Sequence, residues 1–384
     1  MMLGLMLARA GIRVIVLEKW PDFFRDFRGD TIHPSTMENL AELGLLDAFL
    51  KLKHEEVTRL TGIVGNERVT MADFSTLKVS CPFIAFVPQW DFLNLIRESA
   101  SLYPNFKLLM GTQVVDIHEK DGQVTGLYAS SKDEVYDIQC DLVVGADGRN
   151  STVREKAELK VRDFGAPIDV LWFRISRKEE DPSEPAGRFA SGRVMILLYR
   201  KDYWQCGFVI KKDSFEQMRE LGVEWLRAEV LKLAPFLKER VNEITDLSSL
   251  NLLSVKIDRL ERWYKPGLIC IGDAAHAMSP VGGVGINLAV QDAVAAANVL
   301  VPAFKENRLS VIDLAKIQKR RQWPTVATQR VQLFVQNRLI NTIVNQGSTN
   351  RMASMLRLFN RFSLLRKIPS TIIGKGFRPE HVTH

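Results

Sequence analysis

The sequence is poor in cysteine, and the four that it has lie far apart along 384 residues. They are Cys81, Cys140, Cys206 and Cys270. No two of them have the spacing of metal ligands, and so few thiols cannot form the disulfide framework of a small secreted domain. We therefore expect no metal site and four reduced cysteines, which are typical of a cytoplasmic protein.

Long hydrophobic runs are also missing. No stretch reaches 18 apolar residues without a strongly polar one, so the sequence predicts no transmembrane helix. The apolar residues 1–8 have no basic segment before them and no small-residue cleavage site after them, which argues against a signal peptide. Apolar residues make up 46% of the chain and charged residues 25%, as in ordinary globular proteins.

Negative charge is scarce in the last part of the chain. Residues 316–384 contain 13 lysines and arginines but a single acid, Glu380, and the whole chain carries a net charge of +7. Such a segment can contact an acidic membrane surface or nucleic acid. Aromatic residues do not alternate with its charges as a nucleic-acid platform requires, so we expect no nucleic-acid partner. A solvated helical face is the favoured interpretation, with peripheral membrane contact as the alternative.

The beginning of the chain has the pattern of half a nucleotide-binding unit. Residues 1–10, with apolar residues all round except for Arg9, predict a helix that ends at Gly11, a common residue just after a helix. Residues 14–17 are a largely β-branched run followed by Glu18, the pattern of a strand buried on both faces of a parallel sheet. A helix, a tight turn, a buried strand and a terminal acid form the second half of a βαβ unit.

Much of the chain continues in this α/β style. Apolar periodicity predicts further helices and strands, and Asp121-Gly122 predicts a hairpin turn. The helices are expected at 34–50, 90–101 and 285–300, and the strands within 107–145, with a buried one at 140–144, and at 267–271.

Segments with the pattern of antiparallel strands interrupt the α/β segments. Residues 57–80 and 166–259 predict antiparallel strands, with one long helix at 214–235. The sequence therefore predicts an α/β fold with an inserted antiparallel sheet and C-terminal helices. The predicted domains are a discontinuous nucleotide-binding domain at 1–56, 83–165 and 260–305, an inserted substrate domain at 57–82 and 166–259, and a basic helical region at 306–384.

Two glycine turns follow predicted buried strands that lie far apart in the sequence. The first is VVGADG at 143–148, followed by Ser151 and Arg154. The second is ICIGDAAH at 269–276, followed by PVGGVGIN at 280–287. An Asp-Gly or Gly-Asp dipeptide has no diagnostic value alone, but here each stands at the carboxyl end of a strand with its full flanking pattern.

These turns resemble the DG and GD fingerprints of the class A flavoprotein monooxygenases, which include para-hydroxybenzoate hydroxylase and the ubiquinone-biosynthesis hydroxylases. Gly4, Gly11 and Glu18 match the end of that family's dinucleotide fingerprint, and the resemblance extends from residue 1 to about 300. It implies a Rossmann-like FAD-binding domain of the glutathione reductase type. The family pattern begins with a strand and a GxGxxG turn that this sequence lacks. A misassigned start is the favoured explanation, and a truncated product is the alternative.

The resemblance implies contacts to FAD at the adenosine side of the cofactor. Glu18 would accept hydrogen bonds from ribose hydroxyl groups. Arg28 and Gln89 stand where the family places contacts to the cofactor, with a solvated surface residue as the alternative for each. Val115 stands where the family's backbone contacts the adenine.

The resemblance also implies contacts at the flavin. Asp273 would accept a hydrogen bond from a ribityl hydroxyl. Asp147 would tie the first turn to the pyrophosphate region and to the nicotinamide cofactor, unless it only bonds its own backbone. Residues 280–287 would pass beneath the flavin, and the N–H groups of the next helix would face its pyrimidine carbonyl. The predicted contacts in this segment are Pro280, Gly283, Gly285, Ile286 and Asn287.

The chemistry that the resemblance implies needs no catalytic triad, and the sequence contains none. FAD would carry the reaction, with NADH or NADPH as reductant and O2 as cosubstrate, on an aromatic, phenol-like or polyprenylated small molecule. His276 and Pro280 are the candidates for a direct catalytic role, although His276 is more simply a satisfied turn residue. Alternation on the inserted strands allows about half of the pocket candidates to face the flavin. These candidates are Trp172, Arg174, Tyr199, Tyr203 and Trp204.

Three other interpretations remain. A flavin halogenase of this lineage would contain a Trp-x-Trp-x-Ile-Pro motif, which is absent. An FAD-dependent reductase of the same fold, acting on a polyprenyl chain, agrees with the same fingerprints. A truncated, non-catalytic product that cannot retain FAD agrees with the missing first turn. We favour the monooxygenase and expect a cytoplasmic protein, with membrane association as the alternative.

Overall fold

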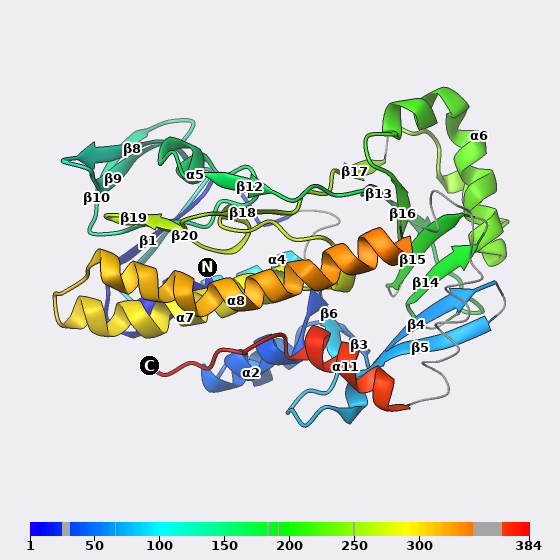
Figure 1. Cartoon of the computed structure of the whole chain (residues 1–384), viewed down its shortest axis with the longest axis horizontal. Helices are drawn as coiled ribbons and strands as arrows, with labels where there is room; N and C mark the ends of the chain where they lie inside the picture. The colour runs from blue at the N-terminus through cyan, green and yellow to red at the C-terminus, as the bar shows by residue number, and fades with distance from the viewer. Residues whose placement is uncertain are drawn as a thin grey trace.

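The computed structural model describes residues 1–24, 31–65, 67–182, 184–190, 192–200, 202–248, 250–340 and 363–384. They form two lobes that lie end to end (Figure 1). One lobe is an α/β unit that contains both chain termini, and the other is a mainly antiparallel sheet, with one parallel pair, covered on its outer side by α6 (Phe215–Leu233). The predicted α/β fold with an inserted antiparallel sheet is thereby confirmed.

Two pairs of parallel strands form the centre of the α/β lobe. β1 (Val14–Glu18) pairs with β7 (Phe106–Met110), and β11 (Val143–Gly145) pairs with β20 (Leu268–Cys270). Among the described residues no strand ladder joins the two pairs. The helices that share the core of this lobe are α1 (Met2–Arg9), α4 (Gln89–Ser101) and α7 (Gly285–Lys305).

The first strand is less buried than the sequence predicts. β1 forms at the predicted residues, but its Ile15 side chain is 47% exposed, so the expectation of burial on both faces was wrong. Within the described residues β1 has one hydrogen-bonded neighbour, β7. A run of β-branched residues predicts the strand itself, whereas its burial depends on neighbours that no local pattern encodes.

Two predicted turns are confirmed by their backbone angles. Gly11 follows α1 with a φ of +87°, a left-handed conformation that favours glycine. Asp121 and Gly122 have φ angles of +53° and +77° and connect β8 (Gln113–Lys120) to β9 (Gln123–Ser130). This is the hairpin turn that the dipeptide predicts.

The helix expected at 34–50 is instead two helices. α2 (Pro34–Glu42) ends before Gly44, whose φ is +74°, and α3 (Leu46–Leu50) follows it. The apolar spacing continues across the break, which is why the periodicity suggested one helix. The remaining short elements of this lobe are β2 (Thr31–Ile32), β3 (Glu55–Val57), β6 (Ile84–Phe86), β10 (Val135–Gln139), α5 (Thr152–Lys156), β12 (Val161–Asp163), β18 (Asp258–Leu260) and β19 (Tyr264–Lys265).

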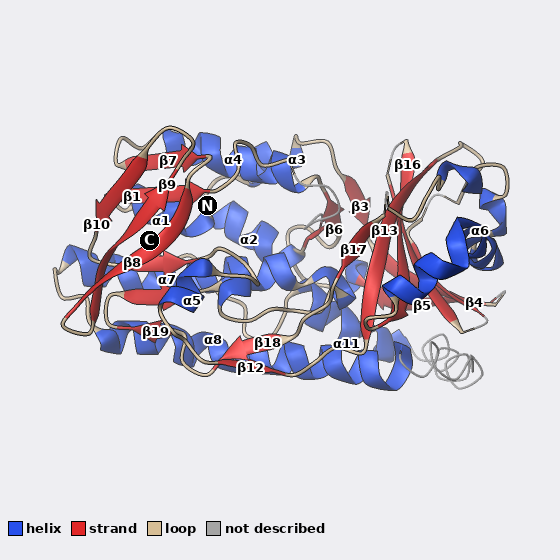
Figure 2. Cartoon of the chain, turned by 90° about the horizontal axis from the view of Figure 1, so that it is seen from above, coloured by secondary structure: helices blue, strands red, loops and turns tan. Residues whose placement is uncertain are grey.

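The second lobe is built on a seven-stranded sheet in the order β17-β13-β16-β15-β14-β4-β5. Its two faces pack differently: one lies under α6, and the other faces the α/β lobe (Figure 2). Segments far apart in the chain thus share one sheet. The strands are β4 (Arg59–Val64), β5 (Glu67–Asp73), β13 (Ile168–Ser176), β14 (Ala186–Ala190), β15 (Arg193–Tyr199), β16 (Tyr203–Lys211) and β17 (Asn251–Leu253).

The C-terminal part of the chain connects both lobes. α8 (Val311–Val335) begins with a capping box between Ser310 and Asp313 and runs beside α7 toward the sheet (Figure 1). α11 (Ser363–Gly374) packs against β5 and against the turn η1 (Phe74–Thr76). From there the last ten residues return to the α/β lobe beside α2 (Figure 1).

One helix in the described part of the chain is long and apolar enough to cross a membrane. It spans Val281–Lys305, and 67% of its most apolar window is buried inside the protein. A core helix of a globular protein has the same composition, and α7 shares its core with α1, β20 and α8. The four cysteines are free, and only Cys140 is not fully buried.

Candidate functional site

The two glycine turns lie side by side, although 126 residues separate Gly145 from Ile271 in the sequence. β11 and β20 pair in parallel with Gly145 opposite Cys270, so both turns leave the same edge of the sheet. The N–H of Ile271 donates to the Gly145 carbonyl at 2.9 Å. A Cβ at Gly145 would lie 2.9 Å from the Cys270 Sγ, so only glycine allows this approach. The carboxyl ends of parallel strands are the usual place for a nucleotide site.

Arginine side chains of the first turn hold the second turn. Arg149 Nη2 lies 3.5 Å from Asp273 Oδ2, and both side chains are about one-third exposed at 31%. Arg154 donates to the Ala274 carbonyl at 3.4 Å and to the Arg149 carbonyl at 2.6 Å. Burial raises the pKa of Asp273, and the nearby Arg149 opposes that shift. Sequence reasoning missed Arg149; its only signal was a cation directly after the Asp147-Gly148 turn.

Asp147 organises its own turn. Its carboxylate accepts from the Val153 N–H at 3.1 Å and from the Ser151 hydroxyl, at the start of α5. This arrangement matches the alternative that the sequence left open, a turn aspartate that bonds local groups. Asp147 is exposed, and its contact to a dinucleotide stays a prediction.

The loop before α7 presents an open helix start. Residues 280–286 are all half-buried, and α7 begins with no side-chain cap and no acid in its first turn. Gly282 and Gly283 have φ angles of +82° and +63°. A Cβ at Gly283 would lie 2.6 Å from the Thr31 Oγ1. Free N–H groups and the helix dipole make this end suitable for an anion or a polarised carbonyl. Pro280, Gly285 and Ile286 lie in or next to this loop as the sequence predicts.

Hydrogen bonds of the Asn287 side chain connect α7 to the segment that precedes α2. Its Oδ1 accepts from the His33 N–H at 2.8 Å and from the Thr36 hydroxyl at 2.7 Å. Its Nδ2 donates to the carbonyls of Thr31 and Gly283 at 3.1 and 3.3 Å. Both atoms of the Asn287 side-chain amide therefore have protein partners, so the predicted cofactor contact would fall to the backbone N–H of Asn287.

Two of the residues predicted for the adenosine side, Glu18 and Val115, lie near the end of β1. The Glu18 carbonyl accepts from the Thr112 N–H at 2.9 Å, which brings β8 to this strand end. Val115 is skipped in the pairing of β8 with β9, where Val114 and Asp116 have partners, and its side chain is 42% exposed. A bulge residue keeps its backbone groups available. Gln89 is half-buried at the first turn of α4, and Arg28 lies outside the described residues.

His276 points away from the open loop and into the core. It is 1% exposed, and its Nε2 lies 2.5 Å from Asp292 Oδ2. Because a carboxylate only accepts, Nε2 carries the hydrogen. The Trp263 ring packs 4.9 Å away, centroid to centroid. This geometry suits a positioning role for His276 rather than contact with a substrate.

The register of the sheet separates the five pocket candidates. Trp172, Arg174 and Tyr203 belong to the face toward the α/β lobe, because Trp172 pairs with Gly207 and Tyr203 with Ser176. Trp204 and Tyr199 belong to the opposite face, where they pack under α6. The sequence allowed about half of the five candidates to face the flavin without saying which, and alternation places these two in the outer core.

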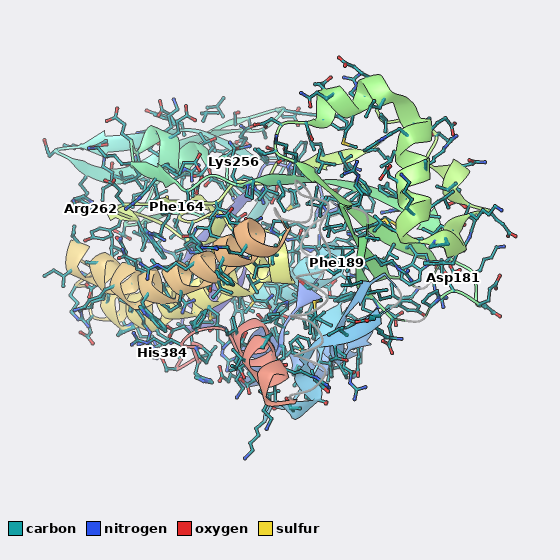
Figure 3. All side chains as sticks on the ribbon, turned by 45° about the vertical axis from the view of Figure 1, so that its right-hand side comes forward. Phe164, Asp181, Phe189, Lys256, Arg262 and His384 are labelled. Carbon is teal, nitrogen blue, oxygen red and sulfur yellow. The ribbon has the colours of Figure 1, made fainter. Side chains whose placement is uncertain are left out.

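The face toward the α/β lobe contains a row that includes three glycines. Gly207, Gly187 and Gly62 stand opposite one another across the sheet, with Ile196 between the first two. The Trp172 ring lies over Gly207, 3.0 Å from where its Cβ would be, and the Phe189 ring lies 3.1 Å from the corresponding point at Gly187. Figure 3 labels Phe189 on the side of the sheet nearer the α/β lobe. Val281, from the loop before α7, packs against the same cluster.

Among the described residues no group of three or more His, Cys, Asp or Glu side chains could hold a metal ion. The site therefore consists of two linked glycine turns, an open helix start and a sheet face floored by flat rings.

Comparison with known proteins identifies relatives over nearly the whole chain. The model of a family described as "FAD binding domain" matches residues 1–331. A 6-methylpretetramide 4-monooxygenase of Streptomyces rimosus is 30% identical over 92% of this chain and 85% of its own length. A 3-demethoxyubiquinol 3-hydroxylase of Escherichia coli is 27% identical over 83% and 82%. The crystal structure of pqsL, a probable FAD-dependent monooxygenase from Pseudomonas aeruginosa, has a TM-score of 0.76 at 20% identity and covers 93% of this chain and 96% of that one.

Proposed function

The chain belongs to the FAD-binding domain family, among the FAD-dependent monooxygenases, and on that premise we propose that it hydroxylates a planar aromatic small molecule. NADH or NADPH would supply electrons, and O2 would supply the oxygen atom. The observation that carries this proposal is the pair of glycine turns at one sheet edge, joined by Arg149 and followed by the open start of α7. Bound FAD supplies the redox chemistry that activates O2.

The described residues fit FAD at both of its ends. Glu18 and the bulge residue Val115 would contact the adenosine side, and Asp273 with the loop at 280–286 would contact the flavin side. The uncapped N–H groups of α7 would stabilise negative charge on a ring carbonyl. The backbone of Gly283 can approach a ligand closely because it has no side chain and a positive φ.

The sheet face supports a planar substrate. The Trp172 and Phe189 rings, which lie over glycines, form an apolar floor on this face of the sheet. The loop at 280–286 stands opposite this floor and contacts it through Val281. A flat aromatic molecule could stack on such rings and present one edge to the loop. The name of the Streptomyces rimosus relative, a 6-methylpretetramide 4-monooxygenase, agrees with oxygenation of a small-molecule substrate.

Apolar side chains around the floor would keep water from the reacting ring. Val170, Val194 and Val209 surround Trp172 on this face and are fully buried. Exclusion of water protects reactive intermediates and strengthens electrostatic contacts. The protein's own part in the reaction is thus to bind, orient and shield.

The direct test is product analysis with isotopically labelled O2. Purified protein with FAD and NADPH or NADH is incubated with a set of phenols and fused-ring aromatics, and product mass is measured. We expect one class of ring compound to accelerate NAD(P)H oxidation and to gain one labelled oxygen atom. A protein that retains FAD but oxygenates no aromatic compound, while it reduces an unsaturated chain, would instead be a reductase. A cytoplasmic location and membrane contact through residues 306–384 stay predictions; cosedimentation with anionic vesicles tests the latter.

A further inference from the structure

The C-terminal segment ends in a buried carboxylate. Glu380 is 1% exposed, although it lies five residues from the end of the chain. Its backbone carbonyl accepts from Asn39 Nδ2 at 2.8 Å, and its N–H donates to Gln291 Oε1. The segment is therefore docked on α2 and α7 by its backbone, and the Glu380 side chain is directed inward.

Two consecutive arginines of α8 receive this carboxylate. Arg320 Nε lies 2.9 Å from Oε1, and its Nη2 lies 2.6 Å from Oε2. Arg321 Nη1 lies 3.5 Å from Oε1. Burial of a carboxylate is costly unless charged donors compensate it. The only acid among residues 316–384 thus forms internal ion pairs with two of the basic residues of that region.

Arg321 also reaches the second glycine turn through one further carboxylate. Its Nε donates to Asp292 Oδ1 at 2.9 Å, and both side chains are 1% exposed or less. The other oxygen, Oδ2, accepts from the Gly272 N–H at 3.1 Å and from His276 Nε2 at 2.5 Å. Burial would raise the pKa of Asp292, but His276 and Arg321 outweigh it and lower that pKa, which keeps the carboxylate ionised.

These contacts form one continuous chain of charged groups. Glu380 contacts Arg321, Arg321 contacts Asp292, and Asp292 holds the backbone of Gly272 and the ring of His276. Asp273, the predicted flavin-side contact, directly follows Gly272 and is the first of the three residues between the two groups that Asp292 holds. We propose that Glu380 is a positioning residue for the FAD site, acting through Arg321 and Asp292 on the turn at 272–276. The inference rests on the proposed function, because it assigns FAD to that turn.

The physical reason is charge compensation in a dry environment. With Glu380 present, Arg321 lies between two carboxylates that fix its guanidinium. Without that charge, the guanidinium has one anionic partner and can turn toward it, which changes the donor geometry around Asp292. Because Asp292 orients the Gly272 N–H, the turn would lose part of its preorganisation. Docking of the segment and binding of FAD are then thermodynamically coupled, and coupling is reciprocal.

The matched variants are Glu380→Gln and Glu42→Gln in the full chain. Glu42 also holds the C-terminal segment, since it lies 2.5 Å from His381 Nδ1 and accepts from the Val382 N–H at 2.7 Å. It contacts neither Arg321 nor Asp292 in the described structure. Both variants loosen the segment, but only Glu380→Gln removes charge from the chain of ionic contacts.

The measurements are FAD affinity from the quenching of flavin fluorescence, the visible circular dichroism of the bound flavin, and thermal unfolding of the FAD-free proteins. We expect Glu380→Gln to weaken FAD binding by about tenfold, within the usual range of coupling between sites, and to change the dichroism of the bound flavin. Glu42→Gln should leave both within twofold of the parent. Equal FAD affinity and equal dichroism in the two variants would overturn the proposal and leave Glu380 a merely structural residue.

A second measurement uses the unmodified chain and does not depend on the folding of a variant. Carboxypeptidase removal of the last residues is followed with and without FAD. Reciprocal coupling predicts that saturating FAD favours the docked segment and therefore slows the removal of residues 380–384. Unchanged cleavage would overturn the positioning role but not the proposed function. Failure of the parent chain to bind FAD at all would overturn both.

Discussion

At the scale of single residues, buried titratable groups make the folding stability depend on pH. His33 has no exposed surface, its Nδ1 lies 2.7 Å from the Ile373 carbonyl, and its Nε2 has no protein partner in the described structure. Because a carbonyl only accepts, Nδ1 carries the hydrogen and the ring is neutral. Burial lowers the pKa of His33 to about 4, and the Ile373 carbonyl opposes this shift only in part.

The His33 ring therefore has to be deprotonated in the folded protein. Its pKa is about 6.5 in the unfolded chain, so the unfolded state binds the proton more readily between pH 6.5 and 4. We expect stability to be complete above pH 6.5 and to fall by roughly 3 kcal/mol as the pH drops toward 4. Urea unfolding at several pH values measures this. The variant His33→Gln should flatten the slope in that range, and an unchanged slope would show that another group controls it.

A second residue-scale prediction concerns the outer core of the sheet lobe. Asp181, labelled in Figure 3, receives two bonds of 2.7 Å from Arg240 and one of 2.9 Å from Trp204 Nε1. Burial would raise the pKa of Asp181, but Arg240 and Trp204 outweigh it and hold the pKa at about 2. This contribution to stability is present above pH ~4 and is lost as the pH falls through about 2.

Removal of the Asp181 charge should be strongly destabilising. Asp181→Asn leaves the Arg240 guanidinium buried without its counter-charge, which typically costs about 3–5 kcal/mol. Thermal and urea unfolding at pH 7 measure the loss. The surface pair Arg219–Glu216, on α6 of the same lobe, supplies the control. Glu216→Gln should cost less than about 1 kcal/mol, and equal losses in the two variants would contradict the account.

At the scale of elements, the sequence predicts features that depend on a local residue pattern. It fails for features that depend on the neighbouring strands. The glycine turns after β11 and β20, the hairpin at Asp121-Gly122 and the start of α7 follow from residue patterns, and the structure has them. The exposure of Ile15 and the faces of Trp204 and Tyr199 depend on strand partners, which no pattern within one segment specifies. Arg149 and Asp292 were missed for a similar reason, because each acts on a turn more than 15 residues away.

An element-scale prediction concerns the glycine row of the sheet. Gly187→Val places a branched side chain beneath the Phe189 ring, where a Cβ alone would already lie at 3.1 Å. The Phe189 ring would have to move away from the sheet, into the space proposed for a planar molecule. We expect the KM for the aromatic substrate to rise by about tenfold, on the order of 1.4 kcal/mol, with the FAD affinity unchanged. Steady-state kinetics and flavin fluorescence measure the two quantities. If the FAD affinity of Gly187→Val falls by a similar factor, the glycine row lies at the cofactor and not at the substrate.

At the scale of the whole molecule, two lobes and a returning C-terminal segment surround one region. The α/β lobe contributes the glycine turns and the open start of α7, and the sheet lobe contributes the floor of rings (Figures 1 and 2). α8 extends along the first lobe toward the second, so that Val335 packs near the floor while Arg321 holds Asp292. The order of these elements along the chain predicted an inserted sheet, whereas the role of the C-terminal segment became visible only in three dimensions.

The two glycine turns and the open start of α7 should together bind FAD. The most direct measurement is the visible absorption spectrum of the purified chain after FAD is added and the excess is removed by desalting. We expect flavin absorption bands that survive desalting and that are shifted relative to those of free FAD, as in an ordered binding site. A protein that stays colourless after this treatment, while it unfolds cooperatively as an intact fold, would contradict the account.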